Sequence, residues 1–112
     1  MDMEYKKKQL TLEEILALAK TLKNWNKHES VIEDTKTESY TAFYKHATFI
    51  LSQKYNKQES LQDYNITIIF NGNTQNFSSD KRITNFYNNV KRSLERSLEI
   101  SIMAYKRKYH RK

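Results

Sequence analysis

The chain has 112 residues, no cysteine and a formal net charge of +7 at pH 7. This length suits one small core, so we expect residues 1–112 to form a single domain. The absence of cysteine excludes a disulfide framework, thiolate catalysis and sulfur-ligated metal sites. No apolar run is long enough to cross a bilayer and the start lacks the pattern of a signal peptide, so we expect a cytoplasmic protein with no membrane partner.

The first predicted element is a helix over about residues 11–26. Thr11 and Glu14 have the spacing of a capping box, in which each end of the first turn satisfies the other. Apolar residues then recur at helical intervals as far as Trp25. The polar stretch over about residues 27–38 contains no such repeat, and we predict that it is a linker.

A second helix is predicted over about residues 39–55. Its aromatic and aliphatic side chains, from Tyr40 to Tyr55, follow one another in steps of three and four residues. Aromatic residues at this spacing are more often buried in a core than used for stacking on bases. We therefore assign this stripe to the core.

A β-hairpin is predicted over about residues 64–77. Apolar side chains alternate with polar ones from Tyr64 to Phe70, which is the period of a strand. Asn71 and Gly72 follow directly, and this pair is the strongest short signal for a two-residue hairpin turn. The turn residues are explained by the turn itself and need no binding role.

The last predicted element is a long helix over about residues 80–108, ending in a basic tail over about residues 106–112. Its apolar stripe is longer than a small domain needs, so we expect the far half to form a homodimer. The residues expected at that interface are Leu94, Leu98, Ile102 and Tyr105. The expected fold class is α+β and mostly helical, in the order helix, helix, hairpin, long helix.

The positive charge is unevenly distributed. Residues 1–80 contain ten lysines and eleven acidic residues, whereas residues 81–112 contain ten basic residues and only Glu95 and Glu99 as acids. Every arginine lies in the second segment. Guanidinium groups suit phosphate and carboxylate recognition better than ammonium groups do. Part of this charge is expected to form intrahelical ion pairs of Glu95 and Glu99 with basic residues three or four positions before them.

Opposite the apolar stripe, the long helix presents a basic face that contains asparagines. Such a face fits a nucleic-acid groove or backbone, because arginine and asparagine can bond both phosphates and base edges. We therefore predict DNA binding, with RNA as the less favoured ligand. The predicted binding residues are Arg82, Asn85, Asn89, Arg92, Arg96, Lys106, Arg107, Lys108, Arg111 and Lys112.

Catalytic chemistry has little support in the sequence. The three histidines lack the spacing of metal ligands, and no nucleophile motif is present, so we predict no enzyme activity, no metal and no cofactor. Small size and a Lys/Asn/Ile-rich composition indicate a regulatory or accessory protein of a phage or plasmid. The alternative hypothesis is an inhibitor or immunity factor that docks its basic helix on an acidic protein surface.

Overall fold

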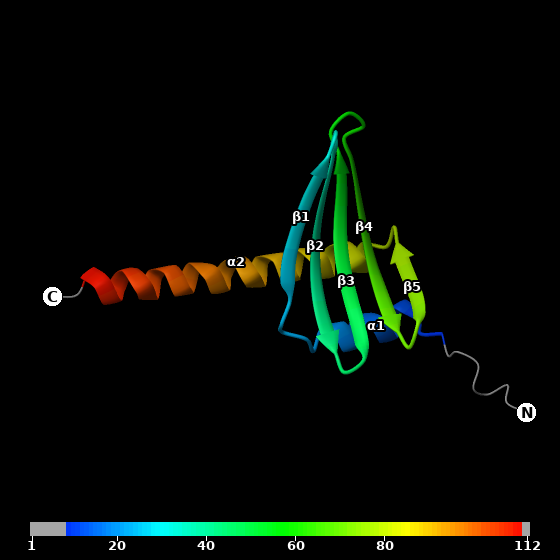
Figure 1. Ribbon diagram of the computed structural model, residues 1–112, viewed down its shortest axis with the longest axis horizontal. Coiled ribbons are helices and arrows are strands. Elements are labelled where there is room, and N and C mark those ends of the chain that lie inside the picture. Colours follow the sequence, from blue (N-terminus) through cyan, green and yellow to red (C-terminus); the bar gives the residue numbers. More distant parts are fainter. Residues whose placement is uncertain (1–8, 111–112) are drawn as a thin grey trace, which may run out of the picture.

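The computed structural model describes residues 9–110 and, within that range, all side chains except those of residues 61 and 108–110. Figure 1 shows a single antiparallel sheet with both helices on one of its faces. The strands follow one another in chain order across the sheet. The elements are α1 (Leu12–Ala19), β1 (Asn26–Ile32), β2 (Thr35–Tyr44), β3 (Ala47–Asn56), β4 (Leu61–Phe70), β5 (Asn73–Ser78) and α2 (Lys81–His110).

The expected fold class is wrong, because a five-stranded antiparallel sheet with two helices replaces a mostly helical chain. The predicted linker over 27–38 is β1 and the first part of β2, and the predicted helix over 39–55 is the rest of β2 together with β3. Alternate residues are buried along these strands, as in Ala47, Phe49 and Leu51. Apolar residues occupy both faces of these strands, and a subset of them also recurs in steps of three and four, so periodicity alone could not distinguish strand from helix.

The turns that join β1 to β2, β2 to β3 and β3 to β4 were not predicted either. Glu33, Lys45 and Ser60 each have φ near +55° without being glycine. A left-handed backbone at such residues is uncommon, and no glycine or proline marks these positions in the sequence. By contrast, Asn71 and Gly72 both have positive φ, as a type I′ hairpin requires, and the predicted hairpin is confirmed as β4 and β5.

Of the two confirmed helices, only the first differs appreciably in length from its prediction. The capping box of α1 is present: the Thr11 side chain accepts a hydrogen bond from the Glu14 amide, and the Glu14 carboxylate accepts one from the Thr11 amide. The helix ends at Ala19, however, several residues before the predicted end. Trp25 therefore lies beyond the helix, just before β1. The final helix begins and ends close to its predicted bounds.

The core lies between the helix-covered face of the sheet and the inner sides of α1 and α2. It contains side chains from both helices and from the three middle strands. The largest fully buried members are Tyr40, Tyr87, Phe49, Ile15, Leu51, Ile66 and Ile83. The other face of the sheet is open to solvent, and Phe43 is 63% exposed there.

Helix α2 crosses the strands and continues past β1, so that its C-terminal half projects from the body of the molecule (Figure 1). Its first half is covered by the sheet, and Ile83 is completely buried. Leu94 is partly buried against the same core. From Glu95 to Arg107 every side chain is exposed. Neither α1 nor α2 is long and apolar enough, over the part the structure describes, to span a membrane.

Candidate nucleic-acid interface

A groove runs along one side of α2: its larger part lies between that helix and the segment joining α1 to β1, and its smaller part lies on α2 alone. It consists of two adjoining cavities of about 450 Å³ and about 290 Å³, which share Asn89 and Ser93. We call them together the α2 groove. The residues that line it are Lys20, Leu22, Lys23, Trp25, Phe86, Asn89, Val90, Arg92, Ser93, Leu94 and Arg96.

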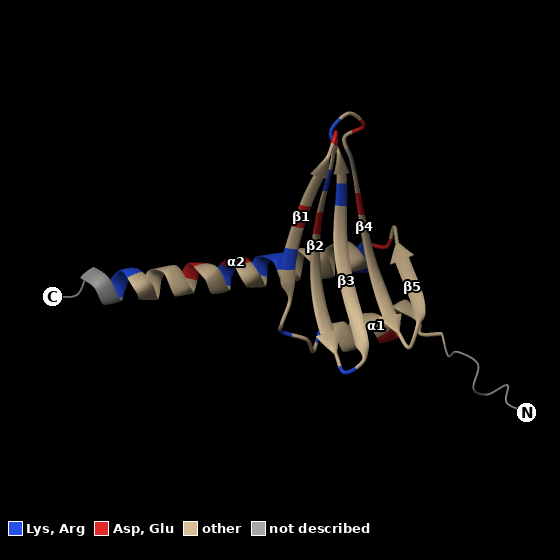
Figure 2. Cartoon of the chain, in the orientation of Figure 1, with Lys and Arg blue, Asp and Glu red and all other residues tan. Residues whose placement is uncertain are grey.

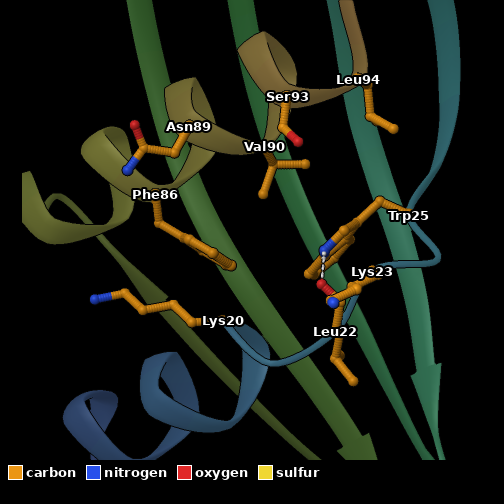
Figure 3. A pocket seen from close by; sticks show the side chains of 9 residues that line it. All are labelled: Lys20, Leu22, Lys23, Trp25, Phe86, Asn89, Val90, Ser93 and Leu94. Carbon is orange, nitrogen blue, oxygen red and sulfur yellow. Dashed lines mark hydrogen bonds between the residues drawn. The ribbon is translucent and has the colours of Figure 1, made fainter. Parts of the chain in front are cut away.

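The wall of the larger cavity is aromatic. Figure 3 shows Trp25 and Phe86 pointing toward each other from the two sides of the groove. Their ring centroids are 5.9 Å apart at an interplanar angle of 75°, an edge-to-face arrangement that aromatic pairs favour. The indole N–H of Trp25 donates to the Leu22 carbonyl oxygen at 3.2 Å, which holds the ring in place. The cavity is therefore lined by fixed apolar surface.

Four cations line the α2 groove. Lys20 and Lys23 line the larger, aromatic cavity, and Arg92 and Arg96 line the smaller cavity beside it. No carboxylate lines either cavity, and among the side chains described in residues 9–110 none forms an ion pair with these four. The charge of the groove is therefore not neutralised from within the described part of the chain.

The expected intrahelical ion pairs of Glu95 and Glu99 are absent from the described residues. Lys91 instead lies 3.3 Å from a carboxylate oxygen of Glu38, on β2. Acidic and basic positions follow one another along the projecting part of α2 (Figure 2). Lys91 therefore pairs with the sheet and not with Glu95. Because Arg92 and Arg96 form no ion pair with a described side chain, both guanidinium groups are available to a ligand.

The structure divides the predicted binding residues into three groups. Asn89, Arg92 and Arg96 lie together in the α2 groove. Asn85 is exposed one turn earlier, and Lys106 and Arg107 are exposed at the far end of the helix. The remaining predicted residues, apart from Arg82, have side chains outside the described part of the chain: Lys108, Arg111 and Lys112.

Arg82 has a structural role at the start of α2. Its guanidinium donates to both carboxylate oxygens of Asp80 at 3.0 Å, and its amide donates to the same carboxylate at 2.8 Å. The side-chain hydrogen bond from Arg82 is the main reason that the pKa of Asp80 is lowered. Asp80 thus caps the helix, and Arg82 is largely engaged in holding that cap.

Lys20, Lys23, Trp25, Phe86 and Ser93 were not among the predicted site residues. The first three come from a segment about 70 residues before Arg92 in the chain. Trp25 had been assigned to a helical core stripe, and the lysines carried no local signal. Only the packing of the α1–β1 connection against α2 brings them beside the arginines.

A buried carboxylate positions α2 over the sheet. Glu38 is 5% exposed and accepts a hydrogen bond from the Tyr87 hydroxyl. Lys91 and Lys27 lie 3.3 Å and 3.4 Å from its two oxygens. The ring of Tyr40 packs edge-to-face on that of Tyr87, at 5.4 Å between centroids. We call these five residues the Glu38 cluster.

The charges of the Glu38 cluster are internally satisfied. Burial acts most strongly on the pKa of Glu38 and would raise it, but the hydrogen bond from Tyr87 and the charge of Lys91 outweigh burial and lower that pKa to about 2. Burial first, and then the bond to Glu38, raise the pKa of Tyr87. No buried side-chain polar atom among the described residues lacks a partner. The Glu38 cluster therefore joins β2 to α2 and fixes the orientation of the groove.

The described residues contain no group of three or more His, Cys, Asp or Glu side chains that could hold a metal ion. His28 and His46 lie on β1 and in the β2–β3 turn, and both are exposed. Comparison of the chain with protein families, with curated proteins and with solved structures found no match.

Proposed function

We propose that this protein binds nucleic acid, with DNA as the preferred ligand and RNA as the less favoured one, and that it catalyses no reaction on it. The observation that carries the proposal is a groove in which Lys20 and Lys23 line an aromatic cavity, Arg92 and Arg96 line the adjoining cavity, and no carboxylate lines either one. The role that fits such binding is that of a regulator or accessory factor. Its origin in a phage or plasmid is supported by composition alone.

The chemistry of the α2 groove suits a polynucleotide strand. Phosphates are bound by lysine as a point charge and by arginine through two parallel hydrogen bonds. Asn89 and Ser93, at the junction of the two cavities, supply neutral hydrogen-bonding groups beside the cations. Trp25 and Phe86 are 9% and 6% exposed, and the small part of each ring that reaches the cavity supplies an apolar surface for the edge of a base or sugar. Phosphate, polar and apolar contacts are thus available within one groove.

The length of α2 supports binding to a duplex. Its outward face carries Asn85, Asn89, Arg92 and Arg96, all exposed. From Arg82 to Arg107 the helix is about 38 Å long at 1.5 Å per residue, close to one turn of B-DNA. An exposed helix of this kind can lie in the major groove, while the lysines beside the α2 groove contact the adjacent backbone.

Fluorescence anisotropy with labelled duplex DNA, single-stranded DNA and RNA at several salt concentrations tests the proposal. We expect duplex binding with a log–log salt slope of about −4 to −6, since each neutralised phosphate contributes about 0.9. If none of the three nucleic acids binds at low salt, the proposal is wrong and the basic face is better tested against an acidic protein surface.

A matched pair of double variants separates a specific site from net charge. Arg92→Ala with Arg96→Ala should weaken duplex binding about tenfold or more and reduce the salt slope by about two. Lys45→Ala with Lys54→Ala removes the same charge from exposed positions on the β2–β3 turn and β3. Equal losses for the two variants would show that binding follows net charge and not the α2 groove.

Trp25 provides a second readout, because it is the sole tryptophan of the chain and lines the larger cavity. Nucleic acid that enters the groove should change its fluorescence intensity or emission maximum at the same midpoint as the anisotropy. Binding that leaves the Trp25 emission unchanged would place the ligand elsewhere on the protein.

A further inference from the structure

The C-terminal half of α2, residues 95–110, is a helix that extends beyond the sheet and α1 (Figure 1). We call it the projecting half. Large apolar side chains remain in water along it: Leu98 is 61% exposed, Ile102 is 45% exposed and Tyr105 is 62% exposed. A helical segment of about 16 residues is marginally stable by itself in water. Both features favour a second surface that covers this stripe.

The two flanks of the stripe are chemically different. At about 100° per residue, Glu95, Glu99 and Lys106 lie on one flank, with the acids near the body and the lysine near the tip. The other flank carries Ser97, Ser101 and Ala104, which are small enough for a close approach of two helices. When two such helices lie antiparallel, the acids of one charged flank therefore face the lysine of the other.

We propose that the projecting halves of two copies of this protein pair antiparallel about a two-fold axis near Ser101. Lys106 of one copy then lies beside Glu95 and Glu99 of the other, and the same contacts recur on the other side of the axis. Leu98, Ile102 and Tyr105 of the two copies cover one another. The two sheets lie at opposite ends of the pair.

Parallel pairing and membrane binding would both cover the apolar stripe, but each fits the charges beside it less well. Parallel pairing about a two-fold axis would place Glu95 and Glu99 of one copy beside the small-residue flank of the other, and Lys106 would then have no acidic partner across the pair. An anionic membrane would meet the same two acids beside the apolar stripe. The pairing does not depend on the proposed nucleic-acid binding, because the α2 groove shares only Arg96 with the projecting half, and Arg96 lies away from the apolar stripe.

Sedimentation equilibrium of the full chain tests the association. We expect a mass of about twice 13.5 kDa at micromolar concentrations. Leu98→Asn with Ile102→Asn should give the monomer mass. The matched control is Ile100→Asn with Met103→Asn, which changes two apolar residues that are 61% and 57% exposed on the opposite side of the helix. This control should remain dimeric.

Two outcomes of that experiment would overturn the proposal. One is a monomer mass for the unmodified chain at all concentrations up to about 100 µM, because an interface that specific should then be occupied. The other is equal loss of association in the two double variants, which would show that general surface hydrophobicity, and not the stripe, drives it.

Charge reversal tests the pairing of the flanks. Lys106→Glu places three acids together at each end of the pair and should raise the dissociation constant about tenfold, since two exposed ion-pair sites are lost. Adding Glu95→Lys and Glu99→Lys to the same chain should restore association. A triple variant that associates no better than Lys106→Glu alone contradicts the antiparallel register.

Cross-linking tests the direction of the helices. The chain contains no cysteine, so introduced thiols are unique. In an equimolar mixture of Ser97→Cys and Ala104→Cys chains, oxidation should yield mainly the mixed disulfide, because the antiparallel register brings these two positions together. Predominant disulfides between two Ser97→Cys chains would indicate parallel helices and overturn the proposal.

Discussion

The two halves of α2 share one helix and one apolar stripe, but they differ in what covers that stripe. In the half from Lys81 to Leu94, the sheet buries Ile83 and Tyr87 almost completely and Glu38 binds Lys91. In the projecting half, the corresponding side chains are exposed. The same local pattern therefore runs through both halves, whereas the stability of the helix at each point depends on the surface that faces it.

The largest expected effect comes from truncating the same residue type in each half. Ile83→Ala should lower the free energy of unfolding by about 2–4 kcal/mol, because it leaves a cavity in a fully buried site. Ile102→Ala should change it by no more than about 0.5 kcal/mol when the protein is dilute enough to be monomeric. Urea denaturation followed by circular dichroism measures both. Equal losses would contradict the contrast between the two halves.

The second prediction concerns the carboxylate that attaches the covered half to β2. Glu38→Gln should lower the free energy of unfolding at pH 7 by about 2 kcal/mol, because Lys91 and Lys27 lose their buried counter-charge. The matched control is Glu29→Gln, an exposed acid that also lies near Lys27, and its effect should stay within about 0.5 kcal/mol.

The pH dependence of stability follows from the same residue. The pKa of Glu38 is about 2 in the folded protein and 4.5 without its surroundings, so the folded state favours the ionised form. Its contribution to stability is complete above pH 4.5 and is lost as the pH falls toward 2. Glu38→Gln should therefore flatten the loss of stability between these values. An unchanged acid profile would show that other carboxylates dominate it.

The smallest expected change in stability tests where the covered half of α2 ends and the projecting half begins. Leu94→Ala should cost about 1 kcal/mol, because this side chain is only partly buried against the core. Leu98→Ala, one turn later and 61% exposed, should leave the stability of the dilute monomer unchanged. If both variants cost the same, the covered half extends farther along α2 than the contacts indicate.

The predictions that are correct depend on residues close together in the sequence, and the wrong prediction for residues 27–55 does not. The capping box at Thr11 and Glu14, the turn at Asn71 and Gly72, and the stripe of α2 each lie within a few residues, and all three form as predicted. The segment over 27–55 failed because its apolar spacing fits two periods and its turns use Glu33 and Lys45 in left-handed conformations. No local rule resolves that ambiguity, because pairing with neighbouring strands decides it.

The candidate site divides in the same way. By itself the sequence determined that Asn89, Arg92 and Arg96 share one face of α2, because helical geometry places residues three and four positions apart together. Only the tertiary structure decided that Lys20, Lys23 and Trp25 lie beside the same helix. It also decided that Lys91 pairs with Glu38 instead of Glu95. The exposure of the second half of α2 depends on the tertiary structure as well. These contacts join residues far apart in the chain, and they form only after the sheet has brought its strands and both helices together.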